Sequence, residues 1–115
     1  MKVAAAALVL LTGIGAASSC EVPTSCEAAI GLAFLDQPVT TRTRFQRIAY
    51  RESRNDPTAQ NGQHLGCLQI ATDVHASRIR AMGFAISDML KALPNALVAK
   101  SLFMESGWSP WAATA

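Results

Sequence analysis

Residues 47–70, RIAYRESRNDPTAQNGQHLGCLQI, decide the fold and pose the main question about this chain. Just before and within this stretch, Phe45, Ile48 and Ala49 have the i, i+3, i+4 spacing of one buried helix face. The next position of that face is Glu52, so a carboxylate is predicted to point the same way as the core side chains. A polar segment rich in turn residues follows it directly.

Two helices are predicted up to this point. Ser25 can cap a helix over residues 26–35, which Pro38 ends. A second helix begins with Thr40 or Thr41 as its cap and runs to about Ser53, within the quoted stretch. Both helices are expected to end before the turn-rich segment, because its residues do not continue the helical spacing.

Beyond that segment the pattern becomes helical again. Short strands, if any, are expected near residues 61–70. Thr72 is predicted to cap a helix that ends near Arg80, Pro94 to open a final helix, and Gly107 to lie just past its end. The fold class is therefore mostly α: a compact helical domain with a short loop or strand insert after the helix that carries Glu52.

The N-terminus has the order of a secretory signal peptide. Lys2 precedes an apolar run over residues 3–14, and small residues follow up to Ser19. The run is shorter than the ~20 residues of a membrane span. We therefore expect residues 1–19 to direct export, with cleavage before Cys20; an uncleaved weak anchor or a buried helix is the alternative.

Length and charge limit the remaining possibilities. The chain has 115 residues and a net charge of +2, which allows one domain and argues against nucleic acid as a partner. We assign residues 20–39 to a tether and first helix, and residues 40–115 to the main domain. Several arginines crowd into residues 42–54; they form either a solvated helix face, which we favour, or a face attracted to an anionic wall polymer.

The three cysteines fit an exported protein. Cys26 and Cys67 are the natural disulfide pair, joining the first helix to the segment after Glu52. Cys20 could then carry a lipid. Membrane attachment is expected only through the leader or through this lipid. No spacing of Cys with His64 or His75 matches a metal site, and we expect neither metal nor cofactor.

Several motifs together resemble one family. The pair Glu52-Ser53, an Asn-Asp-Pro turn, Asn61, the run GCLQI at 66–70 and His75 resemble, in this order, the lysozyme-like lytic transglycosylase domain. The late stretch LPNALVAKSLFMESGWSPW is similar to a helix that ends in Gly-Trp-x-Pro-Trp in small bacterial and phage members. The resemblance covers about Phe45 to Trp111.

The resemblance implies a lysozyme-like fold and an enzyme that acts on peptidoglycan glycan strands. Glu52 would protonate the β-1,4 glycosidic bond between N-acetylmuramic acid and N-acetylglucosamine, then act as base while a 1,6-anhydro ring closes. Ser53, Asn61, Gln69 and His75 would bind substrate: Ser53 by orienting the carboxyl or acetamido group, and Gln69 by reaching across the groove. Such an enzyme would be exported, to the envelope or beyond, and is expected to be a monomer.

Other interpretations stay open at this stage. Glu52 could instead pair with Arg47, Arg51 or Arg54 in a purely structural role. Neither Asp56 nor Asp73 is an obvious second acid, so the sequence does not separate a transglycosylase from a hydrolytic muramidase. A catalytically weak protein that binds wall glycan, or an unrelated small helical interaction protein, are the alternatives from other classes.

Overall fold

A computed structural model describes residues 21–115. The predicted leader and Cys20 lie outside these residues. The domain is mostly helical and carries a small three-stranded sheet after the second helix, as predicted. The elements are α1 (Cys26–Ala33), α2 (Val39–Ser53), β1 (Gln60–Asn61), β2 (His64–Leu65), β3 (Ile70–Ala71), α3 (Ala76–Ala81), the 3₁₀ helix η2 (Ile86–Leu90), α4 (Ala92–Ser106) and the 3₁₀ helix η3 (Ser109–Trp111).

The first helix begins as predicted and the second does not. Ser25 caps α1, because its Oγ accepts a hydrogen bond from the Ala28 N–H at 3.1 Å. The prediction of a threonine cap for α2 is wrong, since Pro38 is the N-cap residue. The Pro38 carbonyl accepts the N–H groups of Thr41 and Arg42, so the helix starts one residue before the first threonine.

The predicted starts of α3 and α4 also shift. The Thr72 hydroxyl donates to the Gln63 carbonyl at 2.8 Å, so it ties β3 to the preceding turn instead of capping α3. Pro94 is the third residue of α4, still in the first turn, where an N–H has no partner within the helix. Gly107 ends α4 with a φ of 62°, as predicted.

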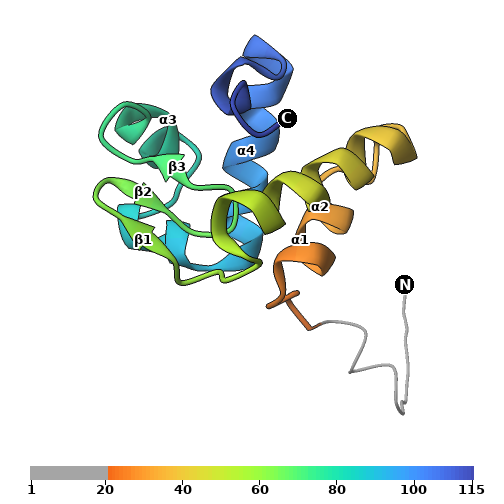
Figure 1. The fold of residues 1–115 in the computed structure, drawn as a ribbon. Coiled ribbons are helices and arrows are strands. Elements are labelled where there is room, and N and C mark those ends of the chain that lie inside the picture. The colour runs from red at the N-terminus through yellow and green to blue at the C-terminus, as the bar shows by residue number, and fades with distance from the viewer. Residues whose placement is uncertain (1–20) are drawn as a thin grey trace, which may run out of the picture.

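The core forms around α4, on which both α1 and the sheet pack (Figure 1). Phe45 is the centre of an aromatic group, with ring centroids 4.4 Å from Phe34 and 4.9 Å from Trp111. These rings join α1, α2 and η3 into one buried cluster. Burial of such aromatic area is the main stabilising term in a domain of this size.

The sheet is antiparallel with strand order β1-β2-β3. Leu65 pairs with Gln60 on one side and with Ile70 on the other. Figure 1 shows the sheet and α3 together on the side of α4 away from α1. Leu65 and Ile70 point into the core, so this polar insert is fixed to the helical part of the domain.

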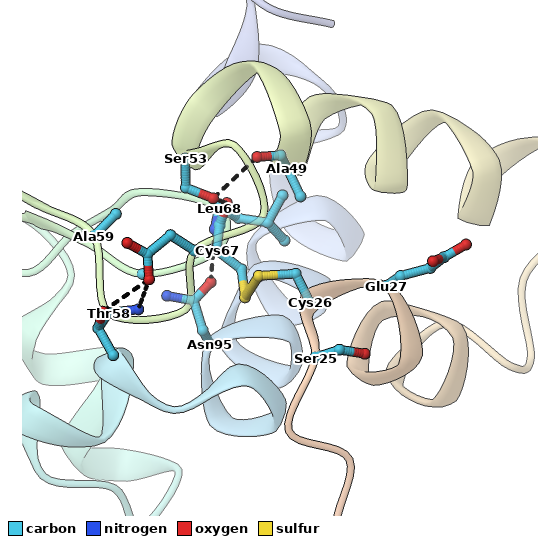
Figure 2. Close-up of a disulfide and its surroundings, with 12 residues drawn as sticks. Ser25, Cys26, Glu27, Ala49, Ser53, Thr58, Ala59, Cys67, Leu68 and Asn95 are labelled. Carbon is cyan, nitrogen blue, oxygen red and sulfur yellow. Dashed lines mark hydrogen bonds between the residues drawn. A yellow bond between two sulfur atoms is a disulfide. The ribbon is translucent and has the colours of Figure 1, made fainter.

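The predicted disulfide is confirmed: Cys26 of α1 is bonded to Cys67, with Cα atoms 5.6 Å apart (Figure 2). It links the start of α1 to the segment between β2 and β3. Disulfides persist in oxidising environments, so the bond is consistent with a location outside the cytoplasm. Within residues 21–115, no helix is both long enough and apolar enough to cross a membrane.

Candidate active site

Glu52 lies in the last turn of α2, where the buried face of the helix reaches the surface. Phe45, Ile48 and Ala49 on the same face are completely buried, whereas Glu52 is half-buried. Its side chain borders a pocket of about 180 Å³. The pocket is lined by Glu52, His64, Gln69, Ile70, Ala71, His75, Leu102, Pro110 and Trp111.

The carboxylate has one hydrogen-bond donor among the described residues. The Thr114 hydroxyl donates to Glu52 Oε2 at 2.7 Å. Arg51, the preceding residue, donates from Nη1 to the Thr114 carbonyl at 2.8 Å. Two adjacent residues of α2 thus hold Thr114 over the end of the helix, and the second oxygen of Glu52 is left free for a ligand.

The salt bridge considered from the sequence is absent from this part of the chain. The ion pairs within residues 21–115 are Arg78–Glu105, Lys91–Asp88 and Lys100–Asp36. None of them includes Glu52. Its carboxylate therefore faces a pocket without a guanidinium against it.

The turn that carries Gln69 also lines the pocket. Gly66 has a φ of +80°, and a Cβ there would lie 2.1 Å from the Met89 carbonyl oxygen, so only glycine fits. Gln69 itself has a φ of +50°. The tight turn brings Gln69 to the pocket wall, as the resemblance implied.

The Gln69 amide is nevertheless directed into its own loop. Its Nε2 donates to the carbonyls of Gly66 (3.0 Å) and Ala59 (3.3 Å), and its Oε1 accepts from Asn61 Nδ2 at 3.1 Å. Only one lone pair of Oε1 remains for a ligand. Asn61 does not line the pocket and acts on it through Gln69.

The Ser53 side chain is buried at the end of α2. Its hydroxyl donates to the carbonyls of Ala49 (3.0 Å) and Cys67 (2.9 Å), and Figure 2 shows the first of these bonds. The hydrogen bond to Cys67 fixes the end of α2 against the loop that leads to Gln69. Ser53 does not line the pocket, so the hydroxyl that the resemblance assigned to substrate binding instead supports the junction of α2 with this loop.

His75 is the N-cap residue of α3 and lines the pocket. Partial burial, and then the charge of Arg78, hold the pKa of His75 below its ordinary value, against the opposite pull of Asp73. The neutral imidazole is therefore favoured, and it can donate to or accept from a sugar hydroxyl. His64 lines the same pocket, and the sequence reasoning did not single it out for this role.

Two further residues support the turn that carries Gln69. Asn95 is completely buried in α4; its Oδ1 accepts from the Leu68 N–H at 3.0 Å, and its Nδ2 donates to the Leu65 and Met89 carbonyls. Figure 2 shows the bond to Leu68. Trp111 donates from Nε1 to the Leu68 carbonyl at 3.1 Å. Between them, Asn95 and Trp111 satisfy both backbone groups of Leu68 and so fix the residue before Gln69.

The other acids considered from the sequence have local roles. Asp56 accepts from the N–H and hydroxyl of Thr58, and these bonds lower its pKa. Asp73 Oδ1 accepts from the Val74 N–H. Glu52 is the one carboxylic acid in the pocket lining. No group of three or more His, Cys, Asp or Glu that could hold a metal ion occurs within residues 21–115.

Comparisons with protein-family models, with curated proteins and with solved structures found no match. The site must therefore be interpreted from its own geometry. That geometry consists of one carboxylic acid, held by a hydroxyl, at the edge of a small pocket whose walls carry an amide and two imidazoles.

Proposed function

We propose that this domain cleaves the β-1,4 glycosidic bond between N-acetylmuramic acid and N-acetylglucosamine in peptidoglycan, with Glu52 as general acid and then base. The observation that carries the proposal is the position of Glu52, which borders a pocket, has a free oxygen and has no cationic partner among residues 21–115. The motif order from Glu52 to Trp111, which resembles lytic transglycosylases, supplies the substrate class.

The chemistry follows from the two oxygens of Glu52. Thr114 occupies Oε2, so Oε1 carries the proton that passes to the glycosidic oxygen as the C1–O bond breaks. The resulting carboxylate then accepts the proton of the muramic 6-hydroxyl as that oxygen bonds to C1. The products are a 1,6-anhydro sugar and a free 4-hydroxyl; no water is consumed, and Glu52 is protonated again.

The single acid of the pocket favours this route over hydrolysis with two carboxylates. Hydrolytic glycosidases ordinarily place a second carboxylate about 5–9.5 Å from the first, and the pocket lining supplies none. Assistance by the substrate's own N-acetyl group replaces the second carboxylate in some glycosidases. A muramidase that uses water in place of the 6-hydroxyl is the second candidate, and its products differ.

The proposed location follows from the same substrate. Peptidoglycan lies outside the cytoplasm, where the disulfide between Cys26 and Cys67 can persist. We infer export through residues 1–19, to the envelope or the medium. The domain would act there as a monomer on glycan strands, with no need for a metal or cofactor.

The direct test is the variant Glu52→Gln, which keeps the shape of the side chain and removes the proton donor. We expect lysis of purified cell walls to fall at least 100-fold, because general acid–base groups contribute about 10²–10⁴-fold. Glu27→Gln is the matched control, since Glu27 is an exposed acid on α1 far from the pocket lining. Equal lysis by the Glu52→Gln protein would contradict the proposal.

A further inference from the structure

A row of four arginines follows one face of α2 and its C-cap: Arg44, Arg47, Arg51 and Arg54. Their spacings of three, four and three residues place them on neighbouring turns of one helix face. At 1.5 Å per residue the row is about 15 Å long. Arg42 does not belong to it, because its guanidinium donates to the Leu35 and Gln37 carbonyls.

Three of the four guanidinium groups of the row are held by neutral partners. Arg44 lies over the Trp108 ring, with Cζ 4.1 Å from the centroid. Arg54 lies 5.1 Å from the Tyr50 centroid and donates to the Tyr50 hydroxyl at 3.2 Å. Arg51 uses one N–H on the Thr114 carbonyl. These contacts restrict the side chains and cancel none of their charge, so less conformational entropy is lost when an anion binds.

No acid neutralises the row within residues 21–115. The three ion pairs of this part of the chain use Arg78, Lys91 and Lys100. The row therefore keeps its positive charge, although the whole chain is only weakly basic at +2. A concentration of like charge on one side of a nearly neutral protein attracts a polyanion to that side.

We propose that this row binds a linear phosphodiester polymer of the cell wall, such as a polyol phosphate. The planar guanidinium fork matches phosphate oxygens in a bidentate manner, and a row one residue wide fits an extended strand. A bilayer fits less well, because interfacial helices expose an apolar face beside their cations. Here Thr40 and Thr43 are exposed beside the row, and the exposed large apolar side chains of α2 are only Val39 and Tyr50, eleven residues apart; Phe45, Ile48 and Ala49 are buried in the core.

The interaction does not require the chemistry proposed for Glu52, although Arg51 of the row also holds Thr114. The row lies on the exposed side of the same helix that carries Glu52 on its buried face. A polymer bound there would keep the domain at the wall without entering the pocket. The row could bind its polymer even if Glu52 performed no catalysis.

The test measures binding of the full chain to poly(glycerol phosphate) by titration calorimetry at several salt concentrations. The double variant Arg44→Gln/Arg47→Gln is expected to bind at least 10-fold more weakly at low salt. Two lost phosphate contacts should also reduce the slope of log K against log salt by about 1.4, since each contact on a single strand contributes about 0.7. The matched control, Arg80→Gln/Lys91→Gln, removes the same charge elsewhere and should bind within about 2-fold of wild type, because neither of its residues belongs to the row.

A second variant tests the proposal if removal of the Arg44 guanidinium from the Trp108 ring disturbs the fold. The Arg47 side chain makes no hydrogen bond, ion pair or ring contact within residues 21–115, so Arg47→Gln alone should fold normally and bind about 3-fold more weakly, as expected for one lost phosphate contact. The double variant Arg44→Lys/Arg47→Lys should recover part of the affinity. Absence of polymer binding, or an equal loss in the Arg80→Gln/Lys91→Gln control, would overturn the proposal. So would tighter binding to phosphatidylglycerol vesicles or to duplex DNA at equal phosphate concentration.

Discussion

The hydroxyl of Thr114 donates a hydrogen bond of 2.7 Å to Oε2 of Glu52, across 62 residues of sequence. Arg51 fixes the backbone of the same threonine through its carbonyl. The side chain that we propose as the catalytic acid is therefore oriented by the segment that follows η3. This contact makes Thr114 a positioning residue whose effect can be measured separately from that of Glu52.

Thr114→Val should lower kcat about 10-fold with little change in KM. The substitution keeps the shape of the side chain but releases the carboxylate from its fixed orientation. A misplaced catalytic group lowers kcat more than it weakens substrate binding. Thr114→Ser restores the hydroxyl and should recover most of kcat. Steady-state kinetics on a soluble glycan oligomer measure both constants; an unchanged kcat in the valine variant would rule out this role.

Asn95→Leu should lower the free energy of unfolding by about 3–5 kcal/mol. The leucine leaves the buried N–H of Leu68 and the carbonyls of Leu65 and Met89 without their partner, and each unsatisfied group costs about 1–3 kcal/mol. Urea denaturation followed by circular dichroism measures the change. The control Thr43→Leu, at an exposed position of α2, should stay within about 0.5 kcal/mol of wild type; similar losses in both variants would contradict the argument.

Reduction of the bond between Cys26 and Cys67 should destabilise the domain by about 4 kcal/mol. The closed loop spans 41 residues of sequence separation, and the loss of its constraint on the unfolded chain gives this magnitude. Thermal melts with and without reductant measure it. The double variant Cys26→Ser/Cys67→Ser should melt at the lower temperature in both conditions. An equal melting temperature of the wild type with and without reductant would show that the bond contributes no stability.

Acidification through the range in which His75 titrates should weaken the fold. Burial and Arg78 hold the pKa of His75 below 6.5 in the folded state, so the unfolded chain binds its proton first. The stabilising contribution of His75 is complete above pH 6.5 and is lost as the pH falls through the lower folded-state pKa. His75→Gln should flatten the decrease of the unfolding free energy between about pH 7 and 5; Ser77→Gln on the same helix should leave it intact. A decrease equally steep in the His75→Gln protein would contradict the assignment.

The sequence predicted those parts of the fold that depend on local chemistry. The Ser25 cap, the end of α2 near Ser53 and the terminal Gly107 were all predicted correctly, because helix ends need particular side chains or backbone angles. The threonine caps failed for different reasons. At α2 the helix starts before the threonines, with Pro38 as the N-cap residue. Thr72 had a better acceptor, the Gln63 carbonyl, in a strand turn that no local pattern reveals.

Of the residues singled out from the sequence, Glu52, Gln69 and His75 line the pocket, whereas Ser53 and Asn61 do not. Helical spacing placed Glu52 on the core face, and the turn chemistry around Gly66 brought Gln69 to the pocket. The sequence did not reveal that the Gln69 amide would bond to its own loop, or that Thr114 would reach Glu52. Both contacts join distant or irregular segments, where periodicity carries no information.

The most direct measurement is mass spectrometry of the products released from purified peptidoglycan by the wild-type and Glu52→Gln proteins. Glu52 acting as acid and then base predicts 1,6-anhydro-muropeptides from the wild type and intact sacculi from the variant. Products with reducing ends would show that the enzyme is a hydrolase. Intact material from both proteins, or identical products from both, would contradict the proposed role of Glu52.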